Sequence, residues 1–242
     1  MLRHSFLKQG ILTTSIAAIS LTICLTGPAS DQAIIRDAVV SASEPPWSGI
    51  AMVTNSVYGR CTGILINART VVTAAHCLYS RRTSQYVRPQ SVHVLLGYDR
   101  GQYGFHSVAK SFQVGIGYDP KRPSATIISD WAILTLEQTA PSAHKPFSIA
   151  PVTGDGQTVF VAGFAQERSE IITLTAACVV TGQVANGLLV SDCNVSHGLS
   201  GGPLIDAASK SAIALQVANV EKGGRHYALS IPLNAITLQD TQ

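Results

Sequence analysis

The stretch HGLSGGPL, residues 197–204, places a serine among glycines. A serine hydroxyl is a weak nucleophile and needs a neighbouring base to take up its proton. Attack on an amide carbonyl creates an oxyanion, which backbone N–H groups can stabilise, and glycines let the backbone approach a substrate closely. The stretch therefore predicts Ser200 as a nucleophile, with the N–H groups of Gly198 and Ser200 as an oxyanion hole. The alternative interpretation is a glycine-rich turn whose serine has no chemical role.

Two further stretches supply the partners that such a serine needs. In TAAHC, residues 73–77, His76 is the candidate base, because a neutral imidazole accepts a proton near pH 7. In SDWAIL, residues 129–134, Asp130 precedes an apolar run, where a buried acid needs a partner. Asp130 would then fix the tautomer of His76 and stabilise its protonated form. Taken singly, the two residues fit a structural histidine and an aspartate in a surface turn.

Together the three stretches resemble the His, Asp and Ser motifs of the chymotrypsin-fold serine endopeptidases, in the chain order of that family. PW at 46–47, CTG at 61–63 and VAGF at 161–164 extend the resemblance to nearly all of residues 34–235. The bacterial trypsin-like and glutamyl-endopeptidase-like branch is especially similar, since Cys193 lies several residues before the serine motif.

This resemblance implies an all-β fold of two six-stranded antiparallel barrels, with the active site in the cleft between them. It also implies a secreted serine endopeptidase that hydrolyses peptide bonds through an acyl-enzyme intermediate. Ser200 would be the nucleophile, His76 the general acid and base, and Asp130 the orienting acid. The N-terminal barrel, residues 30–145, would carry His76 and Asp130, and the C-terminal barrel, residues 146–242, would carry Ser200.

Three departures from the family pattern concern activation and substrate preference. Leu199 stands where many animal members have an aspartate that pairs with a new N-terminus, and Asn194 stands where trypsin-type enzymes have their specificity aspartate. Gln216 lies near the position of a histidine in glutamyl endopeptidases. We therefore expect no strong preference for Lys or Arg; a polar or acidic preference is the alternative. The candidate pocket residues are Asn194, His197, Gln216, Arg225 and His226.

The rest of the chain predicts short strands between turn signals, without a long helical period. The expected strands span residues 49–54, 63–67, 71–74, 91–97, 112–116, 131–136, 158–164, 171–180, 187–192, 212–219 and 227–231. Short helical turns are expected after His76 and at 233–242. Residues 141–153 are expected to link two lobes.

The cysteines of the body predict two disulfides, since an even set in an exported chain implies pairing. VANG at 184–187 predicts a hairpin with Gly187 in the left-handed conformation. Counting along its arms puts Cys178 opposite Cys193, or within a residue or two, and leaves Cys61 and Cys77 to each other. Each bridge would contribute about 3 kcal/mol. The sequence contains no CxxC motif and no two histidines at i,i+4 spacing, so it gives no support for a metal site.

Residues 1–29 show the order of a secretory signal peptide: basic, then apolar, then small. The apolar run 11–25 is shorter than the roughly 20 residues that a spanning helix needs, which disfavours a membrane anchor. Cleavage is expected near Ala29, and Cys24 would leave with the signal. A lipoprotein signal at Cys24 is disfavoured by the bulky Ile23 before it. The expected location is secreted or periplasmic.

Composition and charge limit the partners. With 46% hydrophobic and 13% charged residues, the chain is not disordered. Its formal net charge is +3, and two basic residues within 1–29 leave a nearly neutral body. Such a body gives no electrostatic reason to expect nucleic acid or an anionic membrane as a partner. We expect a monomer that needs no cofactor, keeps no stable membrane anchor after signal removal, and acts on protein or peptide substrates.

Other functions fit the motifs less well. GLSGG at 198–202 satisfies the GxSxG elbow of α/β-hydrolases. That fold orders its triad as Ser, acid, His, whereas His226 is the only histidine after Ser200, and the strand–turn–helix context is missing. Paired cysteines are not typical of a Deg-type periplasmic protease. A secreted protease-like binding module without catalysis stays open, although all three triad residues are present.

Overall fold

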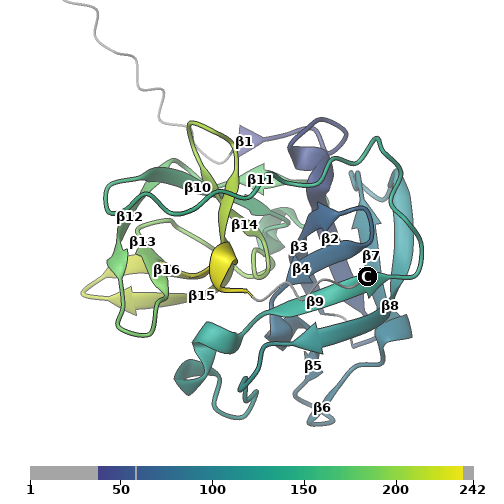
Figure 1. Ribbon diagram of the computed structural model, residues 1–242, viewed down its shortest axis with the longest axis horizontal. Coiled ribbons are helices and arrows are strands. Elements are labelled where there is room, and N and C mark those ends of the chain that lie inside the picture. The colour runs from purple at the N-terminus through teal and green to yellow at the C-terminus, as the bar shows by residue number, and fades with distance from the viewer. Residues whose placement is uncertain (1–37, 58, 237–242) are drawn as a thin grey trace, which may run out of the picture. The chain divides into compact units, whose positions relative to one another are not determined.

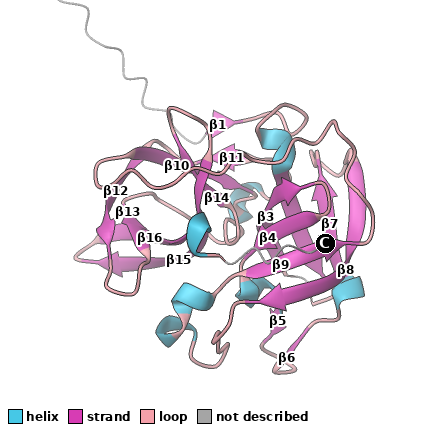
Figure 2. Ribbon diagram, in the orientation of Figure 1, coloured by secondary structure: helices cyan, strands magenta, loops and turns pink. Residues whose placement is uncertain are grey.

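The computed structural model describes residues 38–57 and 59–236. The predicted signal peptide, residues 1–29, lies outside the described residues, as does Cys24. Within that range, strands are joined by loops and by short 3-10 turns (Figure 2). No helix there is long and apolar enough to cross a membrane.

Six antiparallel strands close into a barrel in the first half of the chain (Figure 1). Around the barrel they are β2 (Ile50–Asn55), β3 (Arg60–Asn67), β4 (Thr70–Thr73), β9 (Ala132–Leu136), β8 (Phe105–Val114) and β7 (Val92–Leu96), and β7 pairs with β2. Val92, Val94 and Leu96 are buried and alternate with less buried residues, because successive side chains of a strand point to opposite faces. This alternation fills the barrel interior with apolar side chains.

The second half of the chain forms a second ring of six antiparallel strands. In order they are β10 (Thr158–Gly163), β12 (Cys178–Gln183), β13 (Leu189–Ser191), β16 (Arg225–Pro232), β15 (Ala212–Lys222) and β14 (Pro203–Asp206). The ring closes because β14 also pairs with β10. Outside it, β11 (Thr173–Leu174) pairs with β10, and β1 (Ala38–Val39) pairs with β11. The two closed barrels confirm the predicted all-β fold.

Short elements connect the barrel strands. A small ribbon pairs β5 (Tyr79–Ser80) with β6 (Gln85–Tyr86). The 3-10 turns of the described range are η1 (Trp47–Gly49), η2 (Ala75–Leu78), η3 (Pro89–Ser91), η4 (Pro123–Ala125), η5 (Ile127–Ser129), η6 (Gln166–Arg168) and η7 (Leu233–Ala235). The turn predicted after His76 coincides with η2. Of the turn predicted at 233–242, η7 covers Leu233–Ala235, and residues 237–242 lie outside the described residues.

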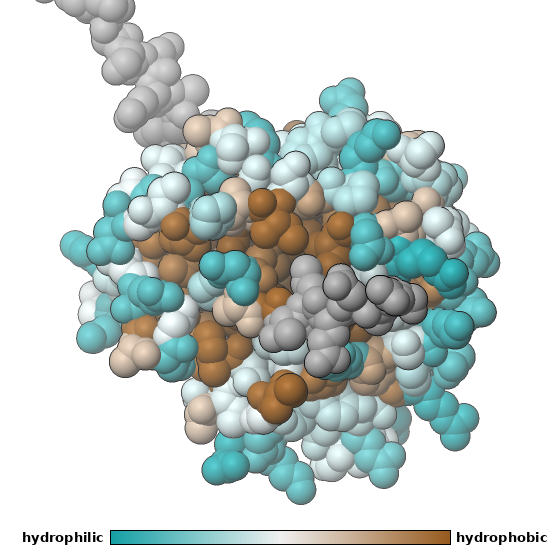
Figure 3. Space-filling view, in the orientation of Figure 1, coloured by the Kyte–Doolittle hydropathy of each residue, from teal (hydrophilic) through white to brown (hydrophobic). Residues whose placement is uncertain are grey.

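Apolar packing is continuous from the first barrel into the junction with the second. One cluster joins Ile64, Leu96 and Leu134 of the first barrel to Phe160 and Leu215 of the second. A smaller cluster fills the interior of the second barrel and includes Val159, Val161, Leu189 and Leu204. On the face shown in Figure 3, hydrophobic residues gather near the middle and hydrophilic residues surround them.

Specific contacts also join the two barrels. The rings of Trp47, which precedes β2, and Phe160 of β10 lie 6.0 Å apart. Glu170, in the loop between β10 and β11, forms an ion pair with Arg60 of β3, whose Nη1 lies 2.6 Å from Glu170 Oε1. The Glu170 carboxylate also accepts a hydrogen bond from the hydroxyl of Tyr98, which follows β7. Side chains of both barrels therefore fix the walls between which a cleft can form.

Both predicted disulfides are present. Cys61 is bonded to Cys77, 16 positions along the chain, and Cys178 is bonded to Cys193, 15 positions along. Gly187 has φ +93°, and its N–H donates to the Val184 carbonyl at 2.8 Å. The predicted hairpin turn is thus confirmed, and it brings the arms that carry Cys178 and Cys193 together.

Several strands differ from the expected set, which also lacks the two-residue strands β1, β5 and β6. β8 begins at Phe105 rather than at 112, because Phe105, Ser107 and Ala109 are all buried in an alternating pattern that a polar composition conceals. β14 was absent from the expected strands; it begins with Pro203, and proline is tolerated at the first position of a strand. The single strand expected at 171–180 is divided into β11 and β12.

Candidate active site

His76 is held by the backbone that surrounds it. It lies in η2, directly after β4, and the preceding Ala74 and Ala75 are fully buried. The following Cys77 is tied by a disulfide to Cys61 of β3. The imidazole itself is 34% exposed. Packing and a covalent link therefore fix its position while one side of the ring stays open to the cleft.

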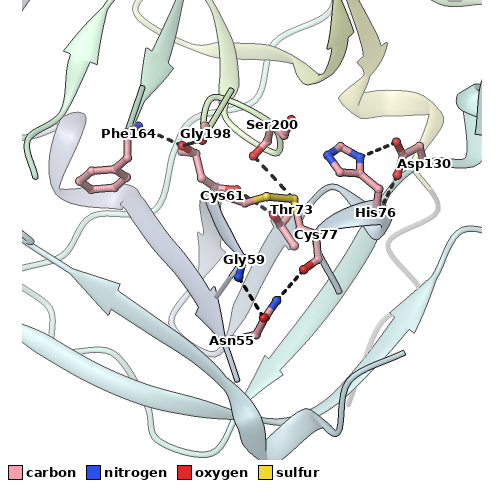
Figure 4. The surroundings of a disulfide bond; sticks show 11 residues. Asn55, Gly59, Cys61, Thr73, His76, Cys77, Asp130, Phe164, Gly198 and Ser200 are labelled. Atoms are coloured by element: carbon pink, nitrogen blue, oxygen red, sulfur yellow. Dashed lines mark hydrogen bonds and ion pairs between the residues drawn. A yellow bond between two sulfur atoms is a disulfide. The ribbon is translucent and has the colours of Figure 1, made fainter. Parts of the chain in front are cut away.

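Asp130 accepts two hydrogen bonds from His76 (Figure 4). Its Oδ2 lies 2.7 Å from His76 Nδ1, and its Oδ1 lies 2.9 Å from the His76 backbone nitrogen. The carboxylate lies between η5 and β9 and its side chain is only 6% exposed. Because a carboxylate only accepts hydrogen bonds, Nδ1 of the neutral imidazole carries the proton. Nε2 is then free to accept a proton.

Tyr118 also faces Asp130 and lines the cleft. Burial first, and then the negative charge of Asp130, raise the pKa of the Tyr118 hydroxyl well above its usual range. The hydroxyl therefore stays protonated and can donate a hydrogen bond to the carboxylate without adding charge. Sequence reasoning missed Tyr118, since it lies in an irregular loop without a motif.

The loop before β14 presents Ser200. The Ser200 carbonyl accepts a hydrogen bond from the Thr62 N–H at 2.9 Å, and the Gly201 N–H donates to the Gln216 carbonyl at 2.7 Å. Gly201 has φ +81°, and a Cβ there would lie 2.3 Å from the Thr62 carbonyl oxygen. Only glycine fits this position, which explains one of the glycines around the serine.

The Gly198 peptide is held from both sides. Gly198 has φ +89°, and a Cβ there would lie 2.2 Å from the Phe164 carbonyl oxygen. The Thr62 hydroxyl donates to the Gly198 carbonyl at 2.8 Å and accepts from the Phe164 N–H at 3.0 Å. In the part of the chain that the structure describes, the N–H groups of Gly198 and Ser200 donate to no protein acceptor. They remain available for a substrate oxygen.

Leu199 packs into the apolar interior of the second barrel. It is 3% exposed and belongs to the cluster that includes Val161, Ala165 and Val195. The neighbouring backbone is fixed as well, since the Gln166 N–H donates to the His197 carbonyl at 2.7 Å. Apolar burial and hydrogen bonds thus shape this loop without a carboxylate at position 199.

His76 and Ser200 line the same cleft between the barrels. Figure 4 shows them on facing sides, next to the Cys61–Cys77 disulfide. Across residues 38–57 and 59–236, no hydrogen bond joins the two side chains. Catalytic hydrogen bonds of this kind commonly tighten only when a substrate binds.

His197 and Gln216 are the predicted pocket residues that the structure brings to the cleft, beside Ser200. Gln216 is 2% exposed, and its amide is fixed by two hydrogen bonds. Its Oε1 accepts from the Ser230 hydroxyl at 2.9 Å, and its Nε2 donates to the Ala218 carbonyl at 2.6 Å. Asn219, which sequence reasoning missed, lines the same wall.

The other predicted pocket residues lie elsewhere. Asn194 lines a separate hollow together with Leu199. Arg225 and His226 are exposed at the start of β16, next to the turn of the β15–β16 hairpin, and neither lines the cleft. Sequence distance from Ser200 could not show that this hairpin extends away from the cleft.

One group of potential metal ligands lies at the site. Atoms of Cys61, His76 and Cys77 lie within 4.8 Å of one another. The two sulfurs are joined in the disulfide, however, and metal binding by cysteine needs the thiolate. The group is therefore a covalent support for His76.

A family model decides the family of the chain. The model of the trypsin-like peptidase domain matches residues 61–215. The chain belongs to the trypsin-like peptidase family. This match includes the positions of His76, Asp130 and Ser200. It identifies the protein as a serine endopeptidase that acts on peptide substrates. No curated protein matches the chain significantly.

Solved structures share the fold. The chain is similar to a Glu endopeptidase, with a TM-score of 0.70 and 19% identity over 83% of this chain and 93% of that one. It is also similar to the VesB protease of Vibrio cholerae, with a TM-score of 0.65 and 21% identity over 82% of this chain. The match covers 64% of the VesB chain. At this level of identity, the likeness concerns the fold.

We predict that Thr62 is a positioning residue for the Gly198 peptide. Thr62→Val replaces the hydroxyl with a methyl group and leaves the buried Phe164 N–H unpaired, which costs about 1–3 kcal/mol. Because the Gly198 peptide then loses its support, the oxyanion of the transition state is held less well, and kcat should fall by about 10- to 100-fold while KM changes little. Thr62→Ser keeps the hydroxyl and should restore most of kcat. Steady-state kinetics on one peptide, with urea unfolding in parallel, measure this; a wild-type kcat for Thr62→Val would contradict it.

We also predict that activity does not need one particular new N-terminus, because Leu199 cannot pair with an ammonium group. Versions of the protein that begin at Ser30, at Asp31 or with a few additional residues should have similar kcat values. The measurement is turnover per active site, with active sites counted by titration. Activity in one cleaved form alone would instead indicate a zymogen whose new ammonium group is buried against another acid.

Proposed function

We propose that this protein is a secreted serine endopeptidase with the triad His76, Asp130 and Ser200. The observation that carries the proposal is the pair of hydrogen bonds from His76 to the buried Asp130 carboxylate. These bonds leave Nε2 as the acceptor on the ring, in a cleft that Ser200 also lines. Two disulfides support an exported protein, with residues 1–29 as its signal peptide.

In the proposed reaction, the Ser200 hydroxyl attacks the carbonyl carbon of the scissile bond while His76 Nε2 takes its proton. The negative charge then moves to the carbonyl oxygen, which the N–H groups of Gly198 and Ser200 stabilise. Asp130 stabilises the positive imidazolium. His76 next gives its proton to the leaving amine, and an ester to Ser200 remains.

Water completes the proposed cycle. His76 takes a proton from a water molecule as that water attacks the ester carbonyl, and the same oxyanion hole holds the second tetrahedral intermediate. When this intermediate collapses, His76 returns the proton to Ser200. The protein's own side chains account for every proton, so we propose that the reaction needs no cofactor.

In the proposed reaction, the acyl half of the substrate lies in the end of the cleft that Gln216 and Asn219 line. This end offers no free charge partner for a basic substrate residue. Among the described residues that line this end, Asp130 is the only acid, and His76 already occupies its carboxylate. The buried Gln216, held by Ser230, supplies a neutral amide instead. A desolvated Lys or Arg head group would therefore be left unpaired.

The triad proposal predicts large losses of turnover from single substitutions. Ser200→Ala should lower kcat by about 10⁴- to 10⁶-fold, and Asp130→Asn by about 10⁴-fold, because the wrong imidazole tautomer is then favoured. Cleavage of a quenched fluorogenic peptide measures this, with EDTA present throughout. A fluorophosphonate should label the wild type and not Ser200→Ala.

Ser43→Ala is a matched control, since Ser43 is exposed and lies outside the cleft. It should keep both activity and labelling. Wild-type proteolysis by Ser200→Ala would refute the triad. A folded wild type that cleaves no peptide would favour a protease-like binding module.

We predict no strong preference for Lys or Arg on the acyl side of the scissile bond, because that end of the cleft lacks an unpaired acid. Sequencing the products from a mixed peptide library measures the preference at every position in one experiment. Cleavage dominated by sites after Arg would contradict this prediction.

A further inference from the structure

The cleft extends away from Ser200 and His76 in two directions. One end lies along Gln216 and Asn219 of β15, and in the proposed reaction it would hold the acyl half of the substrate. The other end lies over the Cys61–Cys77 disulfide and the β5–β6 ribbon. A peptide whose scissile bond lies at Ser200 must place its leaving-group half, the residues after that bond, in this second end.

The second end is lined by arginines. Arg60 of β3 and Arg81 and Arg82 of the β5–β6 turn belong to its wall, together with Ser200 and His76. Arg82 lines this end of the cleft, whereas Arg81 lies at the junction and also lines the end along β15. None of the described residues that line this end is an acid. The nearly neutral body of the protein therefore has a local excess of positive charge next to the reacting atoms.

The three arginines are not equivalent. Arg60 is paired with Glu170 at 2.6 Å, so its charge is already balanced. In residues 38–57 and 59–236, no carboxylate forms an ion pair with Arg81 or Arg82, and both residues are exposed. Two guanidinium groups are thus free to bind an anionic group in the cleft.

We propose that Arg81 and Arg82 select substrates with acidic residues on the leaving-group side of the scissile bond. This inference rests on the proposed function, because it needs Ser200 as the nucleophile to define the two sides. A guanidinium group binds a carboxylate through paired N–H donors. The positive field at this end also attracts acidic peptides and disfavours basic ones.

The expected effect is moderate, since both side chains are exposed and their charges are screened by water and salt. We expect kcat/KM to be about fivefold higher for a peptide with Asp or Glu in the first two leaving-group positions than for the same peptide with Ala. With Lys there, kcat/KM should be lower than with Ala. Raising the ionic strength should reduce both differences.

The first test compares these peptides, which share one acyl half, across four proteins. The wild type should prefer the acidic peptide, and Arg81→Ala with Arg82→Ala should lose that preference. The charge reversal Arg81→Glu with Arg82→Glu should prefer the Lys peptide, a change that partial unfolding cannot produce. Arg88→Ala, which removes an exposed arginine outside the cleft, is the matched control and should keep the wild-type ratio.

A second test examines the leaving-group side alone. An ester substrate forms the acyl-enzyme, and a dipeptide amide with Asp, Ala or Lys as its second residue is then added. Its amine attacks the ester carbonyl, a new amide bond forms, the bond to Ser200 Oγ breaks, and that oxygen recovers a proton. The acidic dipeptide should capture about fivefold more acyl group than the Ala dipeptide.

The outcomes separate this proposal from the function on which it rests. Cleavage of the peptides without an acidic preference, or with a preference that the Arg81 and Arg82 variants leave unchanged, would overturn the proposal alone. A wild type that cleaves none of the peptides would overturn the proposed function and this inference with it. An acidic preference that reverses with the charge supports both.

Discussion

The hydroxyl of Thr62 lies where both barrels and the active-site loop meet. It is fully buried, accepts a hydrogen bond from the Phe164 N–H and donates one to the Gly198 carbonyl. Its backbone N–H holds the Ser200 carbonyl as well. A single residue of the first barrel therefore fixes the peptide groups that are proposed to stabilise the oxyanion in the second. Glycine is required at positions 198 and 201 because a Cβ there would meet the carbonyl oxygens of Phe164 and Thr62.

Much of the fold could be predicted from the sequence because its signals are local. Turn signals predicted most of the strands, and the turn at Gly187 together with the cysteine spacing predicted the hairpin and both disulfides, whereas the two barrels were implied by the resemblance of the three motifs to a known family. The misses have a physical pattern. The start of β8 is concealed because its buried face includes Ser107, and β14 is concealed because it begins with a proline directly after the serine loop.

The site shows the same division between local and distant signals. The three motifs that carry His76, Asp130 and Ser200 could be found from residue types, since each chemical role limits the side chains that can fill it. Tyr118 and Asn219 could not, because only the fold brings their loops to the cleft. Arg225 was expected at the pocket, whereas β15 and β16 pair as a long hairpin and Arg225, next to its turn, does not line the cleft.

The pairing of β1 with β11 has a consequence for the order of assembly. β1 precedes every strand of the first barrel in sequence, yet its hydrogen-bonding partner belongs to the sheet of the second. During synthesis, Ala38 and Val39 emerge long before Thr173 and Leu174 exist, so the first barrel can close while β1 is still unpaired. Such a distant pairing is slow to form. We therefore expect β1, although it is synthesised before every barrel strand, to pair with β11 among the last steps of folding. This pairing then connects the N-terminal segment to the sheet of the second barrel.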